Sequence, residues 1–223
     1  MKNENYNDVV VSKPWGHEYL CFANETVAIW LLNIKKNAST SMHCHPNKNT
    51  GLIVLNGEIE LSFLRNSIRL SALKKISIFR SRFHSSKAVS DDGAILLEIE
   101  TPVDKKDLVR LYDEYGRENK GYEGSNSFTS KNDDCISIPN PSYSNGKINA
   151  HGSFLQHIQI EDNKYIDKLD DESVIVFTNG GYVTKDDKYI LRPSDVIDRK
   201  SLKLISEQFT LNSKTSALIV SKS

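Results

Sequence analysis

The sequence has no surplus of charge of either sign. It carries 29 Lys and Arg residues against 29 Asp and Glu residues over 223 positions, so its formal net charge is zero. Proteins that hold nucleic acid or anionic lipid attract phosphate groups with an excess of Lys and Arg. The balance therefore argues against nucleic acid and against a membrane surface as partners.

Cysteine is scarce, and long apolar runs are absent. The three cysteines, Cys21, Cys44 and Cys135, are far apart and form no C-x-x-C pair. This spacing argues against a disulfide framework or a zinc knuckle and predicts free thiols. No stretch is apolar for long enough to be a signal peptide or a membrane span, so we expect a cytoplasmic protein.

Short runs rich in Val, Ile, Leu and Phe predict β-strands through most of the chain, separated by turn-forming residues. The clearest runs in the first half are Val27 to Ile34, Gly51 to Leu55, Ile59 to Leu64, Lys75 to Phe79 and Ala94 to Ile99. Many short strands at close spacing indicate an all-β sandwich or barrel. Asn56-Gly57 lies between two of these runs and predicts a β-hairpin, because both residues tolerate positive φ.

The pattern changes after Thr101. Asp104 to Tyr115 is charged and places Leu108, Leu111, Tyr112 and Tyr115 at helix-like spacing, and the residues that follow are rich in Gly, Asn and Ser. We expect a short helix here and then a linker.

The strand pattern after the linker repeats that of the first half. Val174 to Gly180 resembles Leu52 to Gly57, Arg192 to Ile197 stands where Leu73 to Ile78 stood, and both halves close on an apolar strand. A repeat of this size indicates duplication of one barrel. The expectation is two tandem barrels joined by the short helix and linker, with domains at 1–125 and 126–223.

His43-Cys44-His45 is the most informative tripeptide. Alternate side chains of a β-strand share a face, so this spacing points both imidazoles the same way and Cys44 the other way. His84 would come from a later strand. Three nitrogen ligands would bind a divalent metal ion (zinc, nickel, iron or manganese) and leave positions open for water or substrate. The second half has no H-x-H pair, so we expect its barrel to be metal-less and to support the first barrel or a dimer interface.

The motif resembles that of the cupin superfamily, in which H-x-H is followed by a Glu, then a Gly, then a further His. His43, His45, Gly57 and His84 match, but Thr50 stands at the position of the glutamate. The resemblance therefore implies a three-histidine variant of the cupin site, whose lower anionic charge favours iron, zinc or nickel over manganese. It also places the Thr50 hydroxyl beside the metal.

A narrower resemblance covers the first 125 residues or so. Lys13-Pro14-Trp15-Gly16-His17-Glu18, Ser41 to Pro46 and Glu98 to Pro102 are similar to segments of cupins of the type II mannose-6-phosphate isomerase kind, and Asp107 to Arg117 resembles an extension of cupins linked to surface-sugar biosynthesis. The resemblance implies a phosphorylated or nucleotide-linked sugar as substrate, contacted by Trp15, Thr50, Arg110 and Arg117. The alternative for the two arginines is a solvated helix face.

Three functions remain open. The first is a sugar isomerase or epimerase, with Lys48, Glu58, Glu60, Glu98 and Glu100 as candidates for proton transfer. Alternation places Glu58 and Glu60 on one face of their strand, and Glu98 and Glu100 on one face of theirs, so each pair lies wholly inside or wholly outside the barrel. The second is a three-histidine Fe(II) dioxygenase. The third is a non-catalytic sugar-binding protein.

Overall fold

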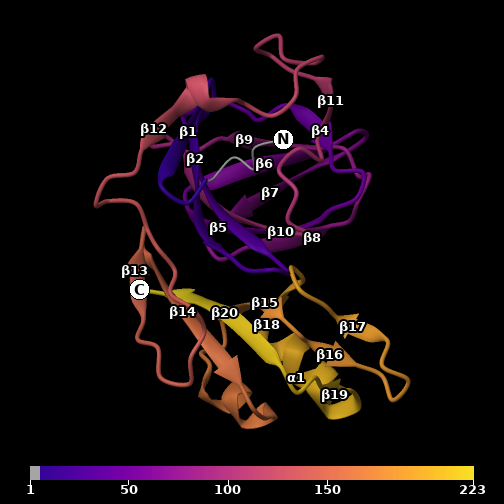
Figure 1. Cartoon of the computed structure of the whole chain (residues 1–223). Helices are drawn as coiled ribbons and strands as arrows, with labels where there is room; N and C mark the ends of the chain where they lie inside the picture. The colour runs from indigo at the N-terminus through magenta and orange to yellow at the C-terminus, as the bar shows by residue number, and fades with distance from the viewer. Residues whose placement is uncertain (1–5) are drawn as a thin grey trace.

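The computed structural model describes residues 6–223, which form two β-barrels in tandem (Figure 1). The first barrel is built from two facing antiparallel sheets. One sheet has the order β12 (Phe128–Ser130), β1 (Val9–Lys13), β2 (Gly16–Ala23), β3 (Ala28–Ile34), β10 (Ala94–Thr101), β5 (Asn49–Asn56), β8 (Lys75–Ile78). The other has the order β11 (Val109–Tyr112), β4 (Met42–Cys44), β9 (His84–Ala88), β6 (Glu58–Phe63), β7 (Ser67–Ser71).

The strand order β3-β10-β5-β8 facing β4-β9-β6-β7 is that of an eight-stranded jelly roll. The second barrel repeats it. One of its sheets has the order β13 (Ile148–Ala150), β14 (Ser153–Ile160), β20 (Thr215–Lys222), β15 (Val174–Asn179), β18 (Val196–Asp198), and the other has β17 (Tyr189–Leu191), β16 (Tyr182–Val183), β19 (Thr210–Leu211). The predicted fold class, two tandem all-β barrels of the jelly-roll type, is confirmed, and β15, β18 and β20 occupy the places of β5, β8 and β10 as the repeat predicts.

One strand of the repeat is missing from the second barrel. Residues 161–173, which the structure describes throughout, form the 3-10 helix η2 (Asn163–Lys168) and no strand, where the first barrel has β4. Helix α1 (Arg199–Gln208) precedes β19. The missing strand is the counterpart of the one that carries His43, so this barrel has no scaffold for an H-x-H pair.

The central sheet of the first barrel is buried on both faces. On β5, Leu52 and Val54 point into the first barrel, whereas Ile53 and Leu55 pack against the second barrel. The same alternation on β15 and β20 divides their side chains between this interface and the second barrel's own core. Burial on both faces explains why these strands are continuously apolar in sequence. No helix among residues 6–223 is long and apolar enough to cross a membrane.

The helix expected after Thr101 is wrong. Asp104 to Tyr115 is not helical: it contains β11, which pairs along β4. The only helix between residue 6 and β12 is the 3-10 helix η1 (Ser125–Ser127). Pairing to the free edge of β4 outweighs the local helical spacing. In addition β12, which lies beyond the expected boundary at residue 125, pairs with β1 of the first barrel.

Asn56-Gly57 is not a hairpin turn. β5 and β6, on either side of it, belong to opposite sheets of the barrel, so the chain crosses here from one sheet to the other. Gly57 has φ 78°, and a Cβ at this position would lie 2.4 Å from the carbonyl oxygen of Gly93. The glycine is therefore required by a positive φ and by close packing at the crossing rather than by a two-residue turn.

Candidate metal centre

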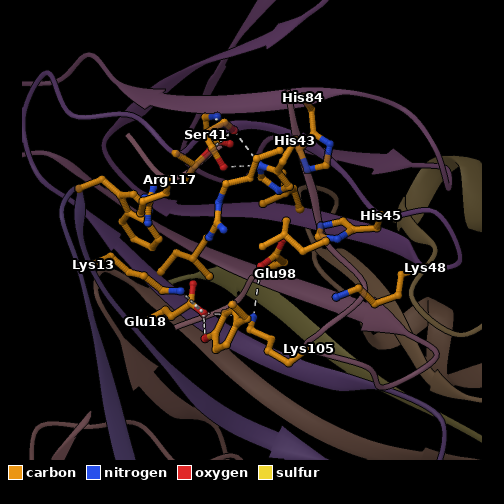
Figure 2. Close-up of a pocket in the computed structure, with 18 residues that line it drawn as sticks. Lys13, Glu18, Ser41, His43, His45, Lys48, His84, Glu98, Lys105 and Arg117 are labelled. Atoms are coloured by element: carbon orange, nitrogen blue, oxygen red, sulfur yellow. Dashed lines mark hydrogen bonds and ion pairs between the residues drawn. The ribbon is translucent and has the colours of Figure 1, made fainter. Parts of the chain in front are cut away.

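The three predicted histidines meet inside the first barrel. His43 lies on β4 directly opposite His84 on β9, and His45 follows two residues after His43 on the same face. One ring nitrogen of each histidine lies within 4.8 Å of those of the other two. Figure 2 shows the three rings converging on one side of the cavity. Strand alternation therefore assembles the cluster, as the sequence predicts.

Each ring is held by a hydrogen bond from its Nδ1 to a backbone carbonyl oxygen. His43 donates to Ser41 at 2.7 Å, His45 to Asp107 at 2.6 Å, and His84 to Arg82 at 2.9 Å. A carbonyl oxygen only accepts, so Nδ1 carries the proton and Nε2 keeps its lone pair.

A metal ion fits these three residues. His45 Nε2 is buried and has no hydrogen-bond partner among the described residues. An unpaired buried polar atom is costly, and coordination of a metal ion would satisfy it. Ligating histidines commonly donate their other ring nitrogen to a carbonyl oxygen, as all three do here.

The histidines are uncharged. Burial lowers the pKa of His84 to about 4, and burial together with the charge of Lys48 lowers the pKa of His45 to about 2. Burial, followed by the neighbouring His84 and His45, also lowers the pKa of His43 well below its usual range. Neutral imidazole is the ligand form, so no proton has to leave before a metal ion binds.

The cluster opens into a cavity of about 60 Å³ within the barrel. Glu98 on β10 reaches this cavity, because inward-facing positions alternate with interface positions such as Leu97. Burial raises the pKa of Glu98, although Lys105, 4.0 Å away, opposes the shift. The lining residues include Lys13, Trp15, Glu18, Ser41, His43, His45, Lys48, His84, Glu98, Lys105, Arg110, Arg117 and Tyr122, most of them labelled in Figure 2.

A buried charge network at the end of the cavity away from the histidines is not predicted from the sequence. Its centre is Glu18 on β2, whose carboxylate lies 3.2 Å from Lys105 Nζ and 3.5 Å from Lys13 Nζ and accepts a hydrogen bond from Tyr122. Burial alone would raise the pKa of Glu18, but Lys105 and Lys13 outweigh it and lower the pKa to about 2. Glu18 is the one acidic residue in a strand that is apolar from Tyr19 onward, which is a usable signal in the sequence. No such signal marks Lys105 or Tyr122.

Lys48 and Glu100 form an ion pair inside the barrel. Lys48 Nζ lies 2.5 Å from Glu100 Oε2, and each side chain is 1% exposed. Glu100 Oε1 accepts a hydrogen bond from Trp30 Nε1 at 3.1 Å. Both groups are thus occupied by structural partners, although Lys48 also lines the cavity.

Glu58 and Glu60 do not line the cavity, so they are not placed for the proton transfer expected of them. Ile59 and Leu61, which alternate with them on β6, point into the core of the barrel, so the two carboxylates face outward. Glu58 pairs there with Arg69 at 3.2 Å. The alternation argument leaves both faces open, and the packing of Ile59 and Leu61 decides between them.

The remaining predicted residues differ in position. Trp15, Arg110 and Arg117 line the cavity. Thr50 is buried on β5, and its hydroxyl has no hydrogen-bond partner in the described chain, but it is not among the residues that line the cavity. Cys44 is buried and free and takes no part in the histidine cluster.

Neither a protein-family model nor a curated protein matches this chain. Solved structures that match include KdgF from Halomonas sp., with 13% identity, a TM-score of 0.39, and coverage of 41% of this chain and 84% of that chain. A RmlC-like cupin from Shewanella frigidimarina NCIMB 400 has 16% identity, a TM-score of 0.39, and coverage of 43% and 85%. The DMSP lyase DddQ from Ruegeria pomeroyi DSS-3 has 18% identity, a TM-score of 0.39, and coverage of 44% and 52%.

Proposed function

We propose that the first barrel is a metal-dependent enzyme that isomerises or epimerises a sugar phosphate or a nucleotide-linked sugar, in surface-sugar biosynthesis. The observation that carries the proposal is Glu98, a buried carboxyl group in the same cavity as the three histidines. Proton transfer at a carbon next to a carbonyl group needs an acid–base residue beside the site that polarises the carbonyl. Burial raises the pKa of Glu98, which suits a group that both takes and returns a proton.

His43, His45 and His84 would hold the metal ion, and three neutral nitrogens suit zinc, nickel or iron(II). A bound ion supplies Lewis acidity toward the carbonyl and hydroxyl oxygens of the substrate. Glu98 removes a proton from the substrate carbon through a carboxylate oxygen and returns it to the neighbouring position. Lys105, 4.0 Å from Glu98, stabilises the carboxylate form of Glu98 before it takes the proton and after it has returned it.

The second barrel supports this site without contributing to it. Its interior is filled by apolar side chains, among them Phe177, Tyr182 and Leu202. Its sheet covers the outer face of β3, β5 and β10, and β10 carries Glu98 on the opposite face. We therefore expect the second barrel to hold β10 rigid.

Deuterium exchange tests the proposal. The zinc-, nickel- or iron-loaded protein is incubated in D₂O with a panel of sugar phosphates and nucleotide-linked sugars, and uptake of one deuterium is followed by mass spectrometry. Glu98→Gln should retain the bound metal and lose the exchange, whereas the matched variant Glu60→Gln, on the outer face, should retain both. Deuterium exchange that persists in Glu98→Gln would show that Glu98 is not the acid–base residue.

The same cluster supports a second candidate. Three neutral histidines with Thr50 in place of a carboxylate ligand also suit a three-histidine Fe(II) dioxygenase. Oxygen consumption by the iron(II)-loaded protein on addition of a panel compound, with no deuterium uptake, would favour the dioxygenase. Saturable binding of a panel compound without either reaction would indicate a sugar-binding protein.

A further inference from the structure

Arg110 and Arg117 both line the metal cavity, but their surroundings differ. Arg117 is fully engaged in structural contacts. Its Nε and one terminal nitrogen donate to the two carboxylate oxygens of Asp113 at 2.9 and 2.7 Å, and its other terminal nitrogen donates to Glu123 at 2.7 Å. This forked pairing folds the segment after β11 and gives each of the three nitrogens of Arg117 a carboxylate partner in the protein.

Arg110 is held in place by its terminal nitrogens, but its Nε–H has no partner among the described residues. One of its terminal nitrogens donates to the carbonyl oxygens of Lys120 and Gly121, and the other lies 3.5 Å from Glu123. Its Nε is buried and has no hydrogen-bond partner anywhere in residues 6–223. The residue is 9% exposed, so bulk water does not readily satisfy this N–H. A buried, unpaired donor on a charged group is costly unless a ligand accepts its hydrogen bond.

Arg110 lies beside the candidate metal site. Arg110 on β11 is the direct cross-strand partner of His43 on β4, and both side chains point into the cavity. Cross-strand partners in an antiparallel pair have Cβ atoms about 5 Å apart.

The charge around Arg110 is not fully compensated. Its carboxylate partner Glu123 also pairs with Lys13 and Arg117. Burial lowers the pKa of Arg110 even though Glu123 opposes the shift, whereas Asp113 and Glu123 together raise the pKa of Arg117 despite its burial.

We infer that Arg110 is the anion anchor of this cavity, and that its Nε–H donates to an oxyanion of the ligand, a carboxylate or a phosphate oxygen, next to the three histidines. The inference rests on the proposed function only in taking that ligand to be the substrate. It assigns the specificity for an anionic group to Arg110 and a purely structural role to Arg117.

Nuclear magnetic resonance of the wild-type protein tests the anchor directly. The protein is labelled with ¹⁵N-arginine and stripped of metal with a chelator, so that no metal ion can hold the added anion. Inorganic phosphate, glycolate and, as a neutral control, ethylene glycol are titrated in while the Nε–H resonances are followed. The Arg110 signal, assigned by its loss in Arg110→Lys, should shift in a saturable way with phosphate or glycolate and not with ethylene glycol. Tighter binding of phosphate indicates a phosphate ligand, and tighter binding of glycolate a carboxylate.

Arg110→Lys keeps the positive charge but removes the Nε–H, and it should weaken anion binding by about tenfold or more, the range expected for a charge-assisted hydrogen bond. The control Arg69→Lys, on the outer face, should leave the affinity unchanged. An Arg110 resonance that neither anion shifts, or an unchanged affinity in Arg110→Lys, overturns the inference. Anion binding requires no turnover, so a protein that binds phosphate through Arg110 but exchanges no proton would refute the proposed enzyme and leave the anchor standing.

Discussion

The Lys48–Glu100 pair allows the sharpest prediction, because each side chain is 1% exposed and 2.5 Å separates the two charged groups. Lys48→Met keeps the length of the side chain and removes its charge. Among residues 6–223, the Trp30 N–H then remains as the hydrogen-bond donor to the buried Glu100 carboxylate. Removal of one member of a buried ion pair costs about 3–5 kcal/mol. For a chain of this size, each kcal/mol lowers the melting temperature by about 2–4 °C. We therefore expect a drop of about 6–20 °C.

The double variant Lys48→Met/Glu100→Gln should recover most of this loss. The amide of Gln is neutral, so no unpaired charge remains buried in the double variant. Its oxygen can still accept the hydrogen bond from Trp30. Neutral replacements for a whole buried pair are often close to wild type in stability. We expect the double variant to lie within about 1–2 kcal/mol of the wild type.

Urea unfolding followed by tryptophan fluorescence reports the stability of the first barrel, which contains the Lys48–Glu100 pair, because both tryptophans, Trp15 and Trp30, lie in that barrel. Unfolding of the single variants, the double variant and the wild type gives the coupling energy between positions 48 and 100. A loss below about 1 kcal/mol in Lys48→Met, or a double variant no more stable than the single one, would refute the buried-pair argument. Deuterium exchange by a stable double variant would further show that Lys48 is structural rather than catalytic.

Three further predictions concern the cavity and its surroundings. His84→Ala should abolish binding of zinc or nickel, measured on the purified protein by elemental analysis. Cys44→Ser should keep full metal content, because Cys44 points away from the cluster. Equal loss of metal in both variants would contradict the strand alternation. Thr50→Val removes a buried hydroxyl that has no partner in the described chain, so it should raise the free energy of unfolding by about 1 kcal/mol. The metal content should not change, and a loss of metal would place Thr50 at the metal instead. The folded pKa of Glu18, about 2, lies below that of an unfolded glutamate, so its stabilisation is present above pH 4.5 and is lost as the pH falls toward 2. Urea unfolding should therefore show Glu18→Gln to be about 3 kcal/mol less stable than the wild type at pH 7 and nearly equal to it at pH 2, and a difference independent of pH would refute the assignment.

Sequence reasoning works here where the physical cause is local. The two-residue period of a β-strand places His43 and His45 on one face, and it requires only that the segment be extended. The same period places Glu98 and Glu100 together, and the structure puts both inside the barrel. It fails for Asn56-Gly57, because the same dipeptide can close a hairpin or carry the chain from one sheet to the other, and the choice depends on which strands pair with its neighbours.

The sequence by itself determined the all-β fold, the duplication, and the three histidines. Tertiary structure decided the rest, because the groups that set the chemistry of the site come from distant parts of the chain. The carbonyl oxygen that fixes the His45 ring belongs to a residue 62 positions away, and the hydroxyl that contacts Glu18 to one 104 positions away. Which nitrogen of Arg110 stays unpaired depends on how the segment after β11 folds over the cavity, and no strand or helix period encodes that path.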